Sequence, residues 1–438
     1  MSHRVGPARW AGEADRLLDR VAGRFGRVET RRRARSFVLG LLAELPRKNC
    51  WSIAEHTGDR DPHGMQYFLG RAKWDTDGVR DDLRGYVTDR LGDTDAVLVV
   101  DETGDLKKGE ATVGVQRQYT GTAGRIENAQ VAVYLVYAGA RGHAMIDREL
   151  YLPRCWTEDP QRLADAGVPD EIEFATKPAL ATGMLTRALR AGVPARWLAG
   201  DEVYGADPGL RAECELQRIG YVLAIGKDRR IPTEAGPTRA DALAADLPRQ
   251  AWQRLSAGRG AKGERYYEWA WIEHTDRAHR DDPLDHQCWS LLIRRHRHTG
   301  ELAFYRCYSP DPVPLRELVR VAGRRWTIEE SFQAGKGLTG LDEHQLRRWT
   351  SWRRWTLLAM LAHALLAVIA AGDHHDQHDR PGLIALSCNE IRRLIVRLVI
   401  DPARALTCPR RWSDWRRRHQ HHARTSHYRR QEADSPRP

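Results

Sequence analysis

Residues 96–101 read AVLVVD, an unbroken apolar run that ends in a single acid, Asp101. Five consecutive apolar residues predict a strand buried on both faces. A second stretch, ARWLAGD at 195–201, predicts another short strand that ends on an acid, Asp201. An acid in such a position is often only a turn residue. The pattern by itself therefore leaves both a structural and a catalytic interpretation open.

The elements around these two strands alternate between strand and helix. Apolar residues recur about every two positions in the predicted strands and about every 3.6 positions in the predicted helices, and this difference distinguishes the two types of element. The predicted order is strands at 113–119, 129–137 and 148–152, a helix at 178–191, a helix at about 207–218, a strand at 221–225, β-hairpins within 227–313 and helices from 314 to 372.

This order resembles the RNase H-like fold. There the first acid lies on the first strand, the second lies just beyond the fourth strand, and the third lies on a later helix, here at Glu329. The resemblance implies that the three acids converge at one edge of the sheet. We expect the class α/β: an RNase H-like mixed sheet with flanking helices, interrupted by a β-rich insertion, plus an N-terminal helical domain.

The length of 438 residues suggests two or three domains. We expect a helical, DNA-binding domain at 1–92, the first portion of the catalytic core at 93–226, a β-rich insertion at 227–313, the second portion of the core with the Glu-bearing helix at 314–400, and a basic, partly disordered tail at 401–438.

Two short helical stretches of the first domain flank Gly58 and have the outline of a helix-turn-helix. An ordinary helical hairpin has the same outline. Arginines lie beside this pair, where they either contact phosphates or form a solvated face. The six are Arg24, Arg27, Arg31, Arg32, Arg33 and Arg35.

The chain is basic, with a formal net charge of +11 and a pI of about 9.5. Such a balance indicates a polyanionic partner. Arginine exceeds lysine, which fits nucleic acid because guanidinium groups bind phosphates and bases in pairs of hydrogen bonds. A GC-rich coding bias would produce the same excess.

The seven cysteines are dispersed and form no CxxC pair, which argues against a disulfide framework and a zinc finger. The N-terminus has no apolar signal core. The longest apolar run, 356–371, is short for a bilayer span and predicts a buried helix. We therefore expect a cytoplasmic, nucleoid-associated protein with no membrane partner.

Three clustered carboxylates repel one another unless divalent metal neutralises them. Hard oxygen ligands suit Mg²⁺, for which Mn²⁺ can substitute. Two such ions, roughly 3.5–4 Å apart, act together on an in-line displacement at phosphorus. No covalent protein nucleophile is then needed, and the sequence has no convincing Ser-His-Asp arrangement.

The chain resembles the DDE transposases of bacterial insertion sequences, and most closely the group called insertion-sequence family 701. Four stretches carry the resemblance, which covers roughly residues 25–372. They are VVDETG at 99–104 with KKG at 107–109, RQYTGTAG at 117–124 with EN at 127–128, TKP at 176–178 with GDEVYG at 200–205, and RWTIEESF at 325–332 with Lys336 and GLD at 340–342.

The last stretch is the most specific, because Arg325, Glu329 and Lys336 fit the spacing of the family's Tyr, Arg, Glu, Lys signature. This chain departs from the signature at the Tyr position, where it has Ala322. The contact with transferred DNA that the family's Tyr would make is therefore not assigned to any residue here. At helical spacing the three matching residues share one face. Glu330 competes with Glu329 as the third acid, and the spacing favours Glu329.

The resemblance implies that Asp101, Asp201 and Glu329 are catalytic and bind the metal. Arg325 and Lys336 would face the DNA backbone. Lys107 and Lys108, just past the first acid, either contact phosphate or cap a hairpin.

The implied activity is metal-dependent cleavage and strand transfer at the inverted-repeat ends of an insertion sequence. The partners would be double-stranded DNA, as terminal inverted repeats and as target, and a homodimer or larger assembly on that DNA. One alternative is a transposase-derived DNA-binding protein that is no longer catalytic. Another is a two-carboxylate hydrolase of sugars, supported only by aromatic residues within 250–310 such as Trp271, Trp289 and Tyr305.

Overall fold

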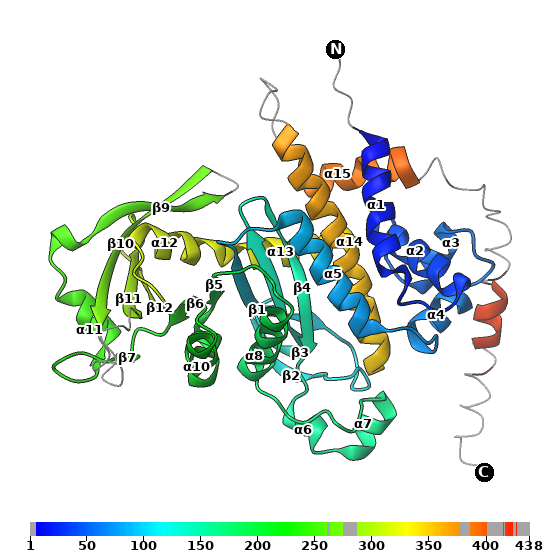
Figure 1. Ribbon diagram of the computed structural model, residues 1–438. Helices are drawn as coiled ribbons and strands as arrows, with labels where there is room; N and C mark the ends of the chain where they lie inside the picture. Colours follow the sequence, from blue (N-terminus) through cyan, green and yellow to red (C-terminus); the bar gives the residue numbers. More distant parts are fainter. Residues whose placement is uncertain are drawn as a thin grey trace, which may run out of the picture.

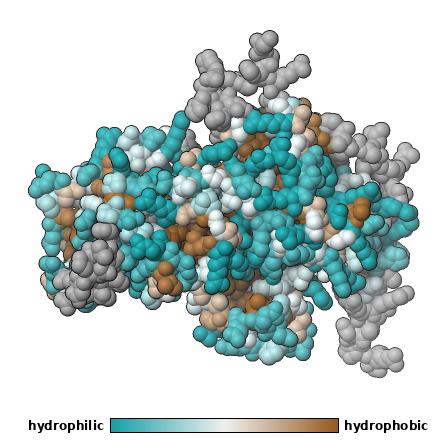
Figure 2. All heavy atoms as spheres, in the orientation of Figure 1, coloured by the Kyte–Doolittle hydropathy of each residue, from teal (hydrophilic) through white to brown (hydrophobic). Residues whose placement is uncertain are grey.

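The structure is a computed structural model, and it describes residues 6–260, 263–274, 287–376, 386–400, 415, 417–423 and 426 (Figure 1). Most of the tail that we expected to be partly disordered, 401–438, lies outside the described residues. On the face shown in Figure 2, hydrophilic residues dominate and apolar residues gather in small areas.

Five helices form the described part of the N-terminal region, where we expected a helical domain. They are α1 (Pro7–Ala22), α2 (Val28–Leu42), α3 (Cys50–His56), α4 (His63–Gly70) and α5 (Thr76–Leu91). Helices α3 and α4 form the expected short pair, and Gly58 between them has a φ of 82°, a conformation that glycine adopts without strain.

Three of the arginines beside this helical pair are already engaged in ion pairs. Arg24 contacts Asp82 at 2.7 Å, Arg35 contacts Asp15 at 2.7 Å, and Arg33 pairs with Asp59. Their charges are thus partly balanced within the domain.

The centre of the molecule is a mixed sheet, shown in Figure 1. Strand β1 pairs antiparallel with β3 and parallel with β5, β5 pairs parallel with β6, and β4 pairs antiparallel with β3. This is the strand order of an RNase H-like sheet, so the predicted fold class is confirmed. The strands are β1 (Val97–Leu106), β2 (Gln116–Thr120), β3 (Arg125–Gly139), β4 (Gly142–Leu150), β5 (Trp197–Gly200) and β6 (Gly220–Ile225).

The predicted burial of β1 is confirmed, because Val97 to Val100 have no exposed surface. Its predicted end is wrong. β1 does not stop at Asp101 but runs on to Leu106, with Asp101 opposite Tyr134 of β3. The parallel partner β5 ends at Gly200, and its last paired residue is Ala199 opposite Val99, so β1 loses its second neighbour just before Asp101. The change from apolar to polar residues along β1 therefore coincides with the end of the neighbouring strand β5.

Helices flank the sheet and connect its strands. They are α6 (Arg154–Thr157), α7 (Pro160–Ala166), α8 (Lys177–Arg190), α9 (Glu202–Gly205) and α10 (Pro208–Leu216). Gly205 allows α9 to lie directly against β6, since a Cβ there would stand 1.9 Å from the carbonyl oxygen of Ala224.

The β-rich segment after β6 continues the same sheet. β12 pairs antiparallel with β6, and the order then runs through β11 and β10 to β9. A small second cluster of buried apolar residues, which includes Ile231, Leu291 and Phe304, packs under it. Its elements are β7 (Arg230–Ile231), β8 (Thr238–Arg239), α11 (Ala240–Ala245), the short helix Arg249–Ala251, β9 (Gln253–Gly260), β10 (Gly263–His274), β11 (Cys288–Arg295) and β12 (Leu302–Ser309).

The C-terminal helices return to the central sheet. They are α12 (Leu315–Arg324), α13 (Trp326–Thr339), α14 (Trp349–Asp376) and α15 (Cys388–Ile395), followed by a π-helical turn at Val396–Ile400. α14 packs against β4, α5 and α2, between the sheet and the N-terminal helices (Figure 1). It is long and apolar enough to cross a membrane, but its most apolar window is 94% buried inside the protein. The prediction of a buried helix is confirmed.

Candidate active site

Asp101 lies on β1 at the point where β5 ends beside it. One carboxylate oxygen, Oδ1, accepts a 2.8 Å hydrogen bond from the backbone N–H of Glu102. The other, Oδ2, lies 3.1 Å from Nη1 of Arg325. The side chain is 14% exposed, so this carboxylate can reach solvent only through a small opening.

Asp201 follows β5 and caps the short helix α9. Its Oδ1 accepts a 2.9 Å hydrogen bond from the N–H of Val203. The parallel register pairs Val99 with Ala199, and its continuation by two residues sets Asp101 beside Asp201. Two sequence stretches a hundred residues apart thus place their acids together because their strands are neighbours.

Glu329 lies on the first turn of α13. Arg325 connects it to the sheet, with Nη2 at 3.5 Å from Glu329 Oε1 and Nη1 at 3.1 Å from Asp101. Glu329 is 44% exposed. The guanidinium therefore bridges the first and third predicted acids.

Glu330, the rival third acid, points to another neighbour. Its Oε2 lies 3.2 Å from Nε2 of His143 at the start of β4. Because of this contact, the pKa of Glu330 is held below its ordinary value. Of the two neighbouring glutamates, only Glu329 shares Arg325 with Asp101.

Burial and charge change the acidity of both aspartates. Burial, followed by the negative charge of Asp201, raises the pKa of Asp101 to about 7, although the positive charge of Arg325 opposes this rise. Burial, followed by the charge of Glu102, also raises the pKa of Asp201. Such perturbed groups are typical of functional sites.

A second layer behind the two aspartates was missed by sequence reasoning. Glu102 accepts a 2.7 Å hydrogen bond from Nζ of Lys177, at the start of α8, and a 2.6 Å hydrogen bond from the hydroxyl of Tyr204 on α9. All three residues lie inside the stretches that carry the family resemblance. Their place in those stretches was the sequence signal from which their role near the site could have been predicted. Their contacts join β1, α8 and α9 around the site.

Lys336 lies two turns beyond Glu329 and points back to β1. Its Nζ donates to the carbonyl oxygen of Gly104 at 3.1 Å and lies 3.3 Å from Asp105. Asp105 also contacts the buried ring of His344 at 3.3 Å. Lys336 remains 17% exposed, so its ammonium stays at the rim of the site.

The two neighbouring lysines after β1 differ in environment. Lys107 is buried, and its Nζ donates to the carbonyl oxygen of His344 at 2.9 Å. The expected phosphate contact of Lys107 therefore does not fit its position, because its ammonium group is turned into the protein. Lys108 is exposed.

The donor chemistry of Asp101 and Asp201 fits a divalent cation. They are carboxylates, the kind of ligand that hard cations prefer. Their mutual repulsion is what a cation would relieve. Within the described residues, however, no three His, Cys, Asp or Glu side chains stand close enough to enclose a metal ion. Glu329 would join the pair only by leaving Arg325.

The raised pKa of Asp101 predicts a pH-dependent stability of the metal-free protein. A carboxyl with a higher pKa in the folded than in the unfolded chain binds more protons when folded, so unfolding free energy falls as pH rises between the two values. In EDTA, Asp101→Asn should remove a fall of up to about 4 kcal/mol between about pH 4 and pH 7. Urea denaturation across this range measures it, and equal pH slopes for variant and wild type would contradict it.

Comparison with known proteins identifies the class to which this fold and acid pair belong. Residues 20–277 match the model of the DDE superfamily endonucleases, and the chain belongs to this family. It is similar to the "Probable transposase for insertion sequence element IS701" of Microchaete diplosiphon, with 31% identity over 190 residues. The match covers 43% of this chain and 47% of the relative, so it spans about half of that protein.

Among solved structures, the protein is similar to the cryo-EM structure of the piggyBac transposase synaptic complex with hairpin DNA. The TM-score is 0.42 at 11% identity, over 94% of this chain and 84% of the other. The resemblance that the sequence motifs predict is confirmed by the family match. Membership of the family also implies dependence on a divalent metal.

Proposed function

We propose that the protein is a DDE-type transposase, which cleaves DNA at the inverted-repeat ends of an insertion sequence and transfers the cut strand to a target. The observation that carries the proposal is the junction of Asp101, Asp201 and Glu329: two neighbouring aspartates with raised pKa values, joined through Arg325 to a glutamate on α13. The DDE family match supports the same chemistry.

Asp101, Asp201 and Glu329 are the residues that would hold the metal, which we propose to be Mg²⁺, with Mn²⁺ able to replace it. Bound there, the metal would lower the pKa of the attacking water or 3′-hydroxyl and stabilise the leaving oxygen. The chain itself contributes orientation. Arg325 orients the Asp101 carboxylate and keeps Glu329 nearby until that glutamate turns to the metal, while Glu102, Lys177 and Tyr204 fix the strand and helix ends behind them.

Double-stranded DNA is the proposed partner, both as terminal inverted repeats and as target. Arg325, Lys336 and Lys108 are the proposed contacts to its backbone, and Lys107 is left out because it is buried. We further propose that the helical domain at 1–92 binds DNA, that 93–226 and 314–400 form the catalytic core around the insertion 227–313, and that a homodimer or larger assembly acts on the nucleoid in the cytoplasm.

The aromatic residues that favoured a sugar hydrolase serve another purpose. Trp289 and Tyr305 are each only 7% exposed, and Trp271 packs against the main core. They are core residues of the extended sheet, so these three side chains do not favour a carbohydrate site over a DNA site.

The decisive experiment incubates the protein with a duplex that carries the end of its own element. We expect cleavage in Mg²⁺ and none in EDTA, with a 3′-hydroxyl at the cut. Tight end binding without cleavage in either Mg²⁺ or Mn²⁺ would instead support the alternative, a transposase-derived DNA-binding protein that is no longer catalytic. Absence of both binding and cleavage would overturn the proposal.

The contrast between Lys107 and Lys108 predicts opposite effects. Lys108→Gln should reduce the slope of log affinity for DNA against log salt by about 0.9, the effect of one lost phosphate contact. Lys107→Met should leave the slope unchanged but lower the unfolding free energy by about 1–3 kcal/mol, because the His344 carbonyl and Asp105 lose a buried partner. Salt titrations and urea denaturation separate these outcomes. A reduced slope for Lys107→Met would refute the assignment.

A further inference from the structure

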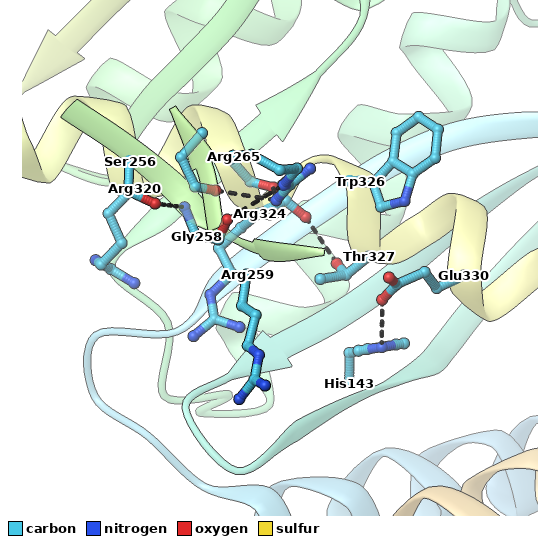
Figure 3. A pocket seen from close by; sticks show the side chains of 12 residues that line it. His143, Ser256, Gly258, Arg259, Arg265, Arg320, Arg324, Trp326, Thr327 and Glu330 are labelled. Carbon is cyan, nitrogen blue, oxygen red and sulfur yellow. Dashed lines mark hydrogen bonds and ion pairs between the residues drawn. The ribbon is translucent and has the colours of Figure 1, made fainter. Parts of the chain in front are cut away.

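A pocket of about 410 Å³ opens between the edge strands of the extended sheet and the start of α13 (Figure 3). Pockets of this size accept a ligand larger than a bare ion. Four arginines and a His–Glu pair give the pocket its chemistry. They are Arg259 and Arg265 of the β9–β10 hairpin, Arg320 and Arg324 of α12, His143 and Glu330.

The pocket is built on a close contact between strand and helix. A Cβ at Gly323 would stand 2.0 Å from the carbonyl oxygen of Ala257, so α12 touches β9 directly. Arg265 joins the two elements, because its Nη2 donates to Ala257 at 2.9 Å and to Gly323 at 3.1 Å. These acceptors are neutral carbonyl groups, and they leave the positive charge of Arg265 in place.

The other charges of the pocket are unevenly balanced. Arg320 is paired with Glu317 at 2.7 Å, and Glu330 is paired with His143 at 3.2 Å. Over the residues that the structure describes, the guanidinium groups of Arg259 and Arg324 make no hydrogen bond or ion pair. Arg259, Arg265 and Arg324 thus bring three positive charges to the pocket, and Glu330, already paired with His143, is the carboxylate in the lining that acts on Arg265 and Arg324.

Arg324 shows the cost of this arrangement. It is only partly exposed, and burial together with the charges of Arg320 and Arg265 lowers its pKa below the ordinary value of an arginine. Like charges held together in a partly desolvated place destabilise the fold unless an anion joins them. Guanidinium groups match the oxygens of phosphate in number and geometry.

The pocket lies next to the candidate active site on the same helix. Glu330 and Trp326 of α13 line the pocket, whereas the residues one position before each point to the active site: Arg325 contacts Asp101, and Glu329 contacts Arg325. Successive residues of a helix point about 100° apart, so the two sets form adjacent stripes along α13. A nucleic acid strand that contacts both the pocket and Asp101 would therefore run across this helix.

We propose that the arginine pocket binds a phosphate group, supplied by the backbone of the DNA a short distance from the phosphate that is cleaved. The inference rests on the proposed function for the source of the phosphate. The binding of an anion itself is inferred from the arginines that line the pocket and does not depend on the proposed function.

The test uses the full chain in EDTA, so that no cleavage is required, and a short duplex of unrelated sequence. We expect Arg259→Gln and Arg324→Gln each to weaken DNA binding about tenfold and to reduce the salt slope by about 0.9. Arg190→Gln is the matched control, since Arg190 of α8 is exposed and outside the pocket. It should change neither quantity.

A second arm uses inorganic phosphate alone. Phosphate should raise the melting temperature of the wild type and not that of Arg324→Gln. Without phosphate, Arg324→Gln should melt no lower than the wild type, since it removes repulsion, and this shows that the variant is folded.

The outcomes separate the two sources of phosphate. Lower salt slopes in both pocket variants support a DNA contact. Stabilisation by phosphate with unchanged slopes would assign the pocket to a free phosphate compound and overturn the DNA contact. Pocket variants that behave like Arg190→Gln in both arms would overturn the site. Because cleavage is not measured, a protein that fails to cut its element's end can still pass this test, and the reverse also holds.

Discussion

Asp101→Asn will leave a folded protein that cleaves DNA at least about a thousandfold more slowly than the wild type in Mg²⁺. The amide keeps the shape of the side chain but removes the negative charge that a divalent cation requires. Loss of a metal ligand removes several kcal/mol of transition-state stabilisation, which corresponds to this factor. The rate of strand cleavage on a duplex with the element's end measures it.

The fold of this variant should not suffer. Asp101 is buried with a pKa raised to about 7, so its charge opposes folding near neutral pH and a neutral amide is tolerated. The matched control is Asp95→Asn, an exposed acid in the turn before β1, which should cleave at the wild-type rate. Full activity of Asp101→Asn in a protein with an unchanged melting temperature would refute the assignment of Asp101.

Glu329→Gln and Glu330→Gln should differ although the residues are neighbours. We expect Glu329→Gln to slow cleavage at least about a hundredfold, and Glu330→Gln to slow it less than about tenfold. The reason is the direction of the side chains. Glu329 shares Arg325 with Asp101, while Glu330 contacts His143 on the adjacent stripe of α13.

Cleavage rates and DNA affinities of both variants should be measured together. Glu329→Gln should retain DNA binding, because the loss lies in the chemical step. Glu330→Gln removes a negative charge from the arginine pocket, so its affinity for DNA should not fall. A larger loss of cleavage in Glu330→Gln than in Glu329→Gln would exchange the roles of the two glutamates.

Local patterns predicted the elements of this fold well. The apolar run before Asp101, the strand before Asp201 and the helical spacing of Arg325, Glu329 and Lys336 all concern residues that are close in sequence. Periodicity records whether a segment is buried on one face or two, and this determines its type. The catalytic role of these residues stays a prediction until the variants are measured.

The failures of prediction concern partners that are distant in the chain. β1 was expected to end at Asp101, yet it continues because β3 remains its neighbour beyond the end of β5. Lys107 and Lys108 look alike in sequence, but only one lies under His344, more than two hundred residues later. The support of Glu102 by Lys177 and Tyr204 likewise depends on α8 and α9 meeting β1.

The sequence by itself therefore determined the class of the fold, the order of its strands and helices, and the acids that end or interrupt them, because these follow from burial patterns within short windows. Only the tertiary structure decided which glutamate shares Arg325 with Asp101, which lysine reaches solvent, and that Arg259, Arg265 and Arg324 share one pocket. Those facts depend on strand pairing and helix packing across the whole chain. A side chain's charge and type are local properties, but its neighbours and its exposure to water are set by segments far away in sequence.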